Sequence, residues 1–210
     1  MDIKPTYTKS MDLKTMNINM QNLSLGYETW ISELKDKGWE VVFVSFLFHP
    51  LRCSGSRVVR AMEEEVERFY KTLLPRVVRH PRRLVNRDRL PRLVGCPDRP
   101  VPRRRPVHRL AELRPNDGLH YHALLAIPGE TRLKRPFSEH FVENRAIYMG
   151  AEGRIAQIHL LPISDPRGGV VLYSLKRVRD GTFATDDILV LPRSRAELGL
   201  AFSPAADGTG

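Results

Sequence analysis

The stretch Trp39-Glu-Val-Val-Phe-Val-Ser-Phe-Leu-Phe48 decides the fold class of this chain. It is rich in β-branched and aromatic residues and closes at His49-Pro50, which is typical of a buried strand. Apolar residues then recur at spacings of three and four: Val58, Met62, Val66, Phe69, Leu73 and Val77. That period predicts one apolar face of an α-helix that starts near Ser56. A buried strand followed by a long amphipathic helix indicates a mixed α/β domain.

The rest of the chain supplies further elements of the same kinds. Helices are predicted at 27–37, 137–147 and 166–180, and strands at 107–113, 119–127, 154–163 and 182–191. The turn Pro115-Asn-Asp-Gly118 would join the first two of these strands into an antiparallel hairpin. Asp165 and Gly181 suit the N-terminal and C-terminal caps of the last helix.

These elements predict one α/β (α+β) domain with a central antiparallel sheet of about five strands flanked by helices. The domain would span residues 26–198, after a poorly ordered segment at 1–25 and before a disordered tail at 199–210. The proline-rich stretch 82–106 is expected to be irregular, with at most one short helical turn.

Positive charge is concentrated in one segment. The formal net charge is +10, and twelve arginines against two acids between Arg76 and Arg109 account for it. Guanidinium groups match phosphate oxygens, so this predicted insertion, 76–109, is expected to bind DNA, although a solvated basic loop would have the same composition. The residues expected to contact DNA are Arg82, Arg83, Arg87, Arg89, Arg103, Arg104 and Arg105.

Composition argues against several other classes of protein. No apolar run approaches the roughly 18 to 20 residues needed to span a bilayer, and residues 1–10 lack the pattern of a secretory signal, so no membrane partner is expected. Cys53 and Cys96 are too few for a four-cysteine zinc site. Two reduced thiols in a cytoplasmic protein are the expectation.

A metal site is predicted around His120 and His122. On a strand these two side chains point to the same face, with Cα atoms about 6 to 7 Å apart. Glu112 precedes the turn and would lie beside them across the predicted hairpin. Two imidazoles and a carboxylate suit Mn²⁺, Mg²⁺ or Zn²⁺, although paired histidines also occur with only local hydrogen bonds.

A nucleophile is predicted at Tyr173. Lys176 follows three residues later on the same helical face, while Val171, Leu175 and Val178 form the opposite, buried stripe. A nearby ammonium favours the phenolate and balances charge on a phosphate, which suits attack on a phosphodiester. An ordinary half-buried tyrosine beside a surface lysine is the alternative.

In this order and spacing the motifs resemble those of HUH endonucleases of the rolling-circle replication initiator (Rep) type. His120-Tyr121-His122 matches the histidine, hydrophobic residue, histidine motif, and Tyr173-Ser-Leu-Lys176 matches the Y-x-x-K motif of the single-tyrosine class. The strand at 43–48 occupies the place of the first motif. Arg177 is a departure, because viral members often carry an acid there, and Asp180 is the candidate substitute.

The resemblance implies a ferredoxin-like or RRM-like fold and a specific activity. Tyr173 and Lys176 would be catalytic, and Glu112, His120 and His122 would hold Mn²⁺ or Mg²⁺. The protein would nick and rejoin single-stranded DNA or an origin hairpin through a 5′-phosphotyrosine, and so initiate rolling-circle replication of a plasmid or phage-like element. A separate helicase would be needed, because the chain has no P-loop signature.

Two alternatives remain open from the sequence. An HUH transposase or a relaxase would share the chemistry and differ in its DNA partner. A non-catalytic, RRM-like nucleic-acid-binding protein is the alternative of another class, although no strand carries the aromatic RNP pattern.

Overall fold

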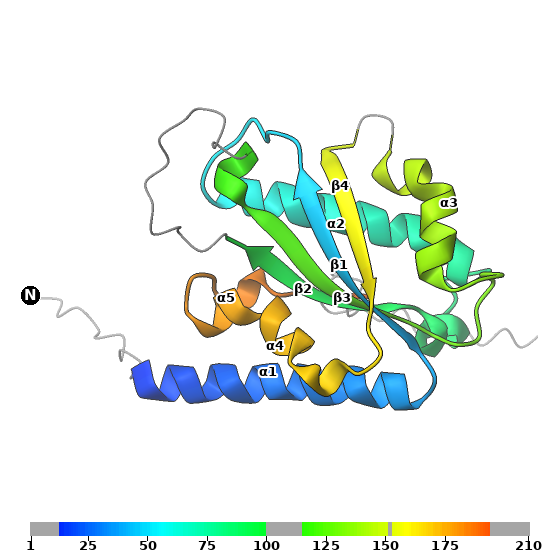
Figure 1. The fold of residues 1–210 in the computed structure, drawn as a ribbon, viewed down its shortest axis with the longest axis horizontal. Helices are drawn as coiled ribbons and strands as arrows, with labels where there is room; N and C mark the ends of the chain where they lie inside the picture. Colours follow the sequence, from blue (N-terminus) through cyan, green and yellow to red (C-terminus); the bar gives the residue numbers. More distant parts are fainter. Residues whose placement is uncertain (1–12, 100–114, 151–152, 194–210) are drawn as a thin grey trace, which may run out of the picture.

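A five-stranded antiparallel sheet forms the centre of the molecule (Figure 1). The computed structural model describes residues 13–99, 115–150 and 153–193. The strands lie in the order β4-β1-β3-β2-β5. Their bounds are Glu40–Phe48 for β1, Arg92–Asp98 for β2, His120–Ile127 for β3, Ile155–Pro162 for β4 and Leu189–Leu191 for β5.

Four of the strands and two helices form a βαββαβ unit. Helix α2 (Ser56–Val77) connects β1 to β2, and α3 (Phe137–Met149) connects β3 to β4. With the order β4-β1-β3-β2, this is the ferredoxin-like arrangement. The short β5 extends the sheet beyond β2. The predicted α/β fold class with a five-stranded antiparallel sheet is therefore confirmed.

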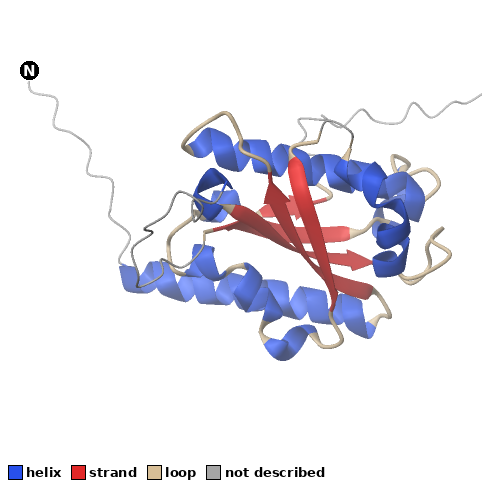
Figure 2. Cartoon of the chain, turned by 45° about the horizontal axis from the view of Figure 1, so that its top comes forward, coloured by secondary structure: helices blue, strands red, loops and turns tan. Residues whose placement is uncertain are grey.

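Different helices cover the two faces of the sheet (Figure 2). Side chains alternate along a strand, so Val42, Val44 and Phe46 of β1 point to one face and Val41 and Phe43 to the other. The first face packs against α2 and α3. The second packs against α1 (Leu13–Asp36), α4 (Val170–Ser174) and α5 (Lys176–Arg179).

Helix α2 follows the apolar period read from the sequence. Met62, Val66, Phe69, Leu73 and Val77 are all buried. The helix ends at Val77, and its last carbonyl groups accept hydrogen bonds from a neighbouring loop. The backbone N–H of Arg132 donates to the carbonyl of Val77 at 3.0 Å, and the Arg132 guanidinium donates to that of Pro75 at 2.7 Å.

The prediction that 82–106 is irregular is wrong for residues 92–98, which form β2. The sequence did not indicate this strand because it contains Gly95 and Pro97, and both residue types are disfavoured inside strands. A β-carbon on Gly95 would lie 2.5 Å from the carbonyl oxygen of His122, so only glycine permits this close approach of β2 to β3. Pro97 lies beyond the part of β2 that pairs with β5, where a strand edge tolerates proline.

Several other boundaries differ from the sequence prediction. Helix α1 begins at Leu13, so residues 13–25 are helical rather than poorly ordered. The hairpin predicted with 107–113 is replaced by pairing of β3 with β1 on one side and β2 on the other. Residues 107–113 themselves, and the predicted tail 199–210, lie outside the described part.

The C-terminal elements are shorter than predicted. The helix predicted at 166–180 is divided into a 3₁₀ turn at Pro166–Gly168 followed by α4 and α5, and Asp165 caps it as expected by accepting from the backbone N–H of Arg167. Strand β5 covers only the end of 182–191, because Thr185–Asp187 forms a 3₁₀ turn. In the described segments, no helix has the length and apolar character to cross a membrane.

Candidate metal centre and nucleophile

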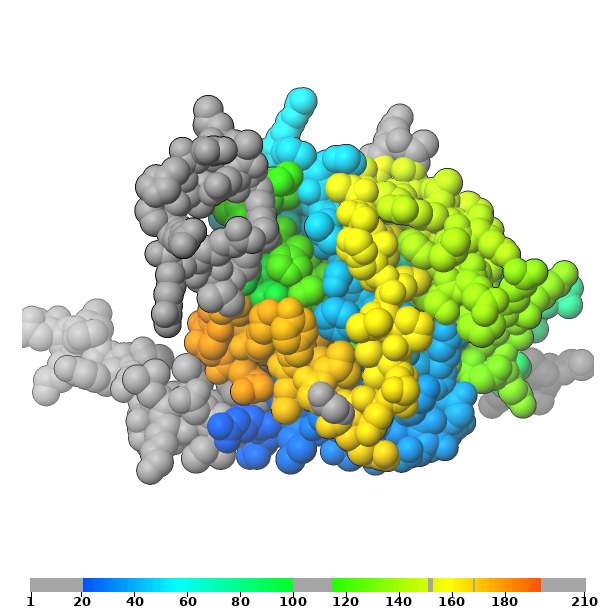
Figure 3. All heavy atoms as spheres, in the orientation of Figure 1, coloured from blue at the N-terminus to red at the C-terminus, as the bar shows by residue number. Residues whose placement is uncertain are grey.

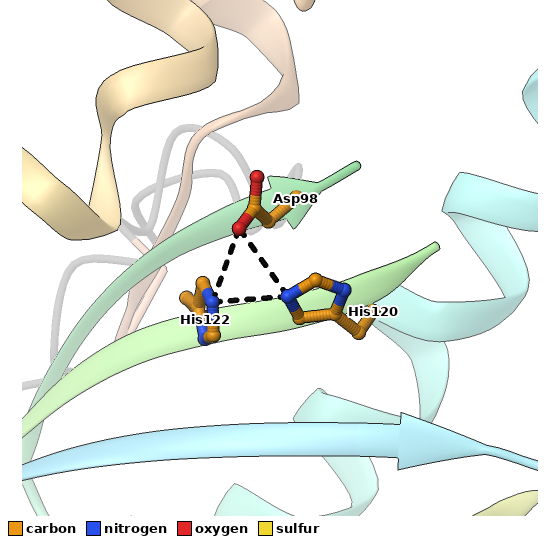
Figure 4. A group of neighbouring side chains, drawn as sticks. All are labelled: Asp98, His120 and His122. Atoms are coloured by element: carbon orange, nitrogen blue, oxygen red, sulfur yellow. Dashed lines mark hydrogen bonds and ion pairs between the residues drawn. The ribbon is translucent and has the colours of Figure 1, made fainter. Parts of the chain in front are cut away.

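His120 and His122 meet a carboxylate from the adjacent strand (Figure 4). Asp98 ends β2 directly opposite His120 in the register of the sheet. Its Oδ2 lies 3.2 Å from Nε2 of His120 and 3.1 Å from Nε2 of His122, and the two Nε2 atoms are 3.0 Å apart. One ligand atom from each residue therefore points to a common position, and the group could hold a metal ion.

The carboxylate at this site is one that the sequence analysis did not select. Glu112, the predicted third ligand, lies outside the described residues. The sequence analysis placed Asp98 in a segment expected to be irregular, so its side chain could not be assigned to a face of the sheet. Recognising 92–98 as a strand antiparallel to 120–126 would have revealed Asp98 beside His120.

Hydrogen bonds on the far side of each imidazole fix its orientation. Nδ1 of His120 is 2.9 Å from the carbonyl oxygen of Gly118, and Nδ1 of His122 is 2.9 Å from Oγ of Ser45. A carbonyl oxygen only accepts, so His120 donates from Nδ1 and its Nε2 carries the lone pair when the ring is neutral. Such outer contacts are typical of metal-binding histidines.

The local turn places His120 for this contact. Asn116 and Asp117 adopt positive φ angles of 54° and 55°, and the Asn116 side chain accepts from the N–H of Leu51 at 2.8 Å. The turn before β3 is thereby held against the segment that follows β1, and the Gly118 carbonyl lies within hydrogen-bond distance of Nδ1 of His120.

Burial and hydrogen bonding favour the ligand-competent forms of these side chains. Asp98 is only 2% exposed, and burial alone would raise its pKa. The contacts of His120, His122 and Lys176 with the carboxylate outweigh burial and hold the pKa of Asp98 well below its usual range. Burial lowers the pKa of His122, which favours the neutral imidazole that a metal requires.

Two cations on α5 also contact the Asp98 carboxylate. Nζ of Lys176 lies 2.8 Å from Oδ2, and Nε of Arg177 donates to Oδ1 at 3.1 Å. Arg177 also donates to Asp180 and to the backbone carbonyl of Arg99. Oδ2 is therefore shared by Lys176 and the two histidines, whereas Arg177 holds Oδ1, and contacts at both oxygens set the plane of the carboxyl group.

Tyr173 lies over the same face of the sheet as the histidines. Its ring centroid is 5.6 Å from that of His122 and 6.0 Å from that of Phe43, and the side chain is 51% exposed. Nζ of Lys176 is 3.9 Å from the Tyr173 ring centroid. The predicted pairing of Tyr173 with Lys176 is therefore present.

The opposite side of the tyrosine helix is anchored as the sequence predicted. Val171, Leu175 and Val178 are buried against the sheet and α1. Sγ of Cys96 on β2 donates to the carbonyl of Ser174 at 3.0 Å. This anchoring leaves Tyr173 exposed next to the Asp98–His120–His122 group.

An open pocket of about 550 Å³ adjoins the histidines. Its lining includes Ser45 and Leu47 of β1 and Gln157 and His159 of β4. Ser45 is opposite His122 on one side and His159 on the other, so these three residues form one row across the sheet. Figure 3 shows β1 and β3 atoms between α5 and β4, where the helices leave the sheet uncovered.

The predicted DNA-binding arginines do not gather at this pocket. Arg82, Arg83, Arg87 and Arg89 are exposed, but they precede the first residue of β2, whereas Asp98 is its last. Residues 103–105 lie outside the described part. The described arginines are therefore separated from Asp98 by the length of β2, about 20 Å for six strand steps.

Comparison of the chain with protein-family models, with curated proteins and with solved structures finds no match to any of them. The class of site therefore rests on its own chemistry. Two imidazoles and one carboxylate are three donors that could hold a metal ion and would leave positions open for water or substrate oxygen. An exposed tyrosine beside such a set has the components needed for metal-assisted nucleophilic attack.

Proposed function

We propose that this protein is a metal-dependent endonuclease that nicks and rejoins single-stranded DNA through a 5′-phosphotyrosine intermediate. The observation that carries the proposal is the position of Tyr173, exposed and 5.6 Å from the His122 ring on the face that bears Asp98 and both histidines. The order of the motifs, which resembles that of single-tyrosine HUH endonucleases, supports the same activity.

Mn²⁺ or Mg²⁺ held by Asp98, His120 and His122 would polarise the scissile phosphate and supply Lewis-acid assistance. The outer contacts to Gly118 and Ser45 would hold the imidazoles in place. Mixed nitrogen and oxygen donors are compatible with either ion.

Tyr173 would be the nucleophile. Its Oη forms a bond to phosphorus while the bond from phosphorus to the 3′-oxygen breaks, the phenolic proton passes to solvent, and the departing oxygen takes up a proton. The products are a 5′-phosphotyrosyl protein and a free 3′-hydroxyl. Because one phosphodiester replaces another, the reverse attack by a 3′-hydroxyl rejoins the strand.

Lys176 would stabilise negative charge at the tyrosine and the phosphate. Partial burial opposes its charge, but the hydrogen bonds to Asp98 and Tyr173 outweigh burial and raise the pKa of Lys176. The side chain is therefore an ammonium at neutral pH, which excludes it as the general base and suits it to electrostatic stabilisation.

The biological setting that fits this chemistry is initiation of rolling-circle replication of a plasmid or phage-like element in the cytoplasm. Single-stranded DNA or an origin hairpin would be the substrate, and a separate helicase would open the duplex. A transposase or relaxase would use the same intermediate on another DNA partner. The predicted arginines would hold DNA that flanks the nick.

Trapping of the covalent intermediate tests the proposal. The protein is incubated with Mn²⁺ and a labelled library of random single-stranded oligonucleotides, and adducts are resolved on a denaturing gel. We expect an adduct with the native chain and with Tyr27→Phe, a matched control on α1, and none with Tyr173→Phe. An adduct that persists in Tyr173→Phe contradicts the assignment, and no adduct on any substrate favours a non-catalytic nucleic-acid-binding protein.

A further inference from the structure

We propose that the end of the sheet opposite the metal centre is a second DNA-contact surface, which binds the phosphate backbone of a duplex beside the nicked strand. The identity of the polymer rests on the proposed function. The surface, called here the basic end surface, consists of residues 75–92 and 128–136, which flank the first residue of β2 and the last residue of β3.

Exposed cations dominate the basic end surface, and two segments distant in sequence contribute them. Examples are Arg82, Arg83, Arg87, Arg89, Arg132 and Lys134. The acids in these segments are Asp88 and Glu130, and Glu130 pairs with Arg89 at 3.8 Å. This ion pair and the pairing of Arg92 with Ala126 place the segment before β2 beside the loop after β3, so cations from both segments lie at the same end of the sheet.

A pocket of about 570 Å³ lies within this surface, between the last turn of α2 and the first turn of α3. Arg76, Arg132, Lys134 and Arg135 line it together with His140 and Glu143. Glu143 is already paired with Arg135 at 2.5 Å. The pocket therefore has a net positive lining into which an anion can bind.

Two of the pocket's guanidinium groups are held in place by the protein. Arg76 donates to the carbonyl of Thr72 at 2.6 Å and lies over the Tyr148 ring, 5.6 Å from its centroid. Arg132 donates to the carbonyl of Pro75. Each of these bonds uses one N–H of the side chain, while a guanidinium has five, so the other donors are available to phosphate oxygens without further ordering of the side chain.

The chemistry of the surface favours backbone contacts over base stacking. Proteins that bind single strands combine cations with exposed aromatic rings. Among the described residues, Tyr173 at the candidate metal centre is the only strongly exposed phenylalanine, tyrosine or tryptophan. Cations without such rings suit the regularly spaced phosphates of a duplex.

The dimensions agree with a duplex held near the nick. Six steps of β2 separate Arg92 from Asp98, about 20 Å, which corresponds to roughly six base pairs along B-form DNA. Both surfaces are built on the same strands, so their separation is fixed by the sheet. A junction between duplex and single strand could therefore contact both ends of one molecule.

Binding of a junction DNA tests this surface independently of cleavage. The full chain is titrated with a single strand and with the same strand carrying a duplex arm longer than one helical turn, across a series of salt concentrations. The test variant is Arg83→Gln with Lys134→Gln, and the control is Lys71→Gln with Arg145→Gln, which removes the same charge from the middle of α2 and α3.

We expect the native chain and the control to bind the junction at least about tenfold more tightly than the single strand. The test variant should lose most of this advantage, and its slope of log affinity against log salt should fall by about two, one for each lost phosphate contact. Its affinity for the single strand should change less than threefold.

The outcomes separate this proposal from the proposed nuclease activity. Junction binding by the test variant that equals the control overturns the surface, even if Tyr173 forms an adduct. Equal losses of affinity for the single strand and for the junction also overturn the proposal, because the surface would then bind single strands. Selective loss on the junction supports the surface, and it does so even where no phosphotyrosine adduct is found.

Discussion

The two faces of the sheet differ in how their side chains change along the strands. The face under α2 and α3 stays apolar from end to end, with Phe46 and Phe69 in edge-to-face contact at 5.1 Å. The face under α1 and α4 begins with apolar residues such as Val94 and Leu124 and ends with Asp98 and His122. The first face forms an apolar core from end to end, and the candidate metal ligands lie at the end of the second face that the helices leave open.

Two carboxylates show the same contrast. Asp98 is almost completely buried, yet its contacts with His120, His122 and Lys176 hold its pKa low. Glu63 on α2 is half-buried, and burial together with the charge of Asp187 raises its pKa to about 7. Burial is thus outweighed by close partners at Asp98, whereas at Glu63 the neighbouring charges of Arg193 and Arg60 do not outweigh it.

The largest effect is expected on stability, from a substitution on the face of the sheet under α2 and α3. Phe69 is fully buried against Phe46, Phe137 and Tyr148, so Phe69→Ala should lower the free energy of unfolding by about 3 to 5 kcal/mol. Denaturant unfolding measures this loss. The folded fraction should bind Mn²⁺ with unchanged affinity, and a large loss of metal affinity would mean that the two faces are coupled.

At the candidate metal centre, a substitution should change the affinity for Mn²⁺ rather than the free energy of unfolding. His122→Ala removes a ligand and should weaken Mn²⁺ binding at least about 100-fold by calorimetric titration. His159→Ala is the matched control, because His159 lies in the same row of the sheet, two strands away, and belongs to no described group of metal ligands. Equal effects of the two substitutions would remove the assignment of His122.

Arg177 provides a finer test of the functional face. Arg177→Gln removes the partner of Oδ1 of Asp98 and should weaken Mn²⁺ binding about tenfold, because the carboxyl group is then free to rotate. Arg177→Lys keeps a charged donor and should recover part of the loss. If Gln and Lys have the same affinity as the native chain, Arg177 does not position Asp98.

The sequence predicted the parts of the fold that have a clear apolar pattern. The stripe of α2 was found because burial on one face imposes regular spacing, and β1 was found because a strand buried on both faces is a run of β-branched and aromatic residues. Strand β2 was missed, because Gly95 and Pro97 are fixed by close approach to β3 and by the end of pairing with β5, which are tertiary facts. The strand propensity of individual residues does not depend on such tertiary contacts, so it cannot reveal them.

The same limit explains which site residues were found. His120, His122, Tyr173 and Lys176 lie within short motifs whose spacing places them on one face of a strand or helix. Asp98 is distant from all of them in sequence and joins them only through the pairing of β2 with β3. Its role depends on register, which a single sequence does not specify when the strand itself is hidden.

The smallest predicted effect concerns Glu63 and its dependence on pH. The folded protein retains the Glu63 proton up to about pH 7, whereas the unfolded chain releases it near the ordinary glutamate value of about 4.3. Stability therefore falls as pH rises through this window, and Glu63→Gln removes that loss. The variant should match the native chain near pH 4 and exceed it by about 1 to 2 kcal/mol at pH 8 in denaturant unfolding. Glu64→Gln, the same change at the adjacent exposed position, is the control, and an equal gain there would attribute the effect to net charge rather than to burial of Glu63.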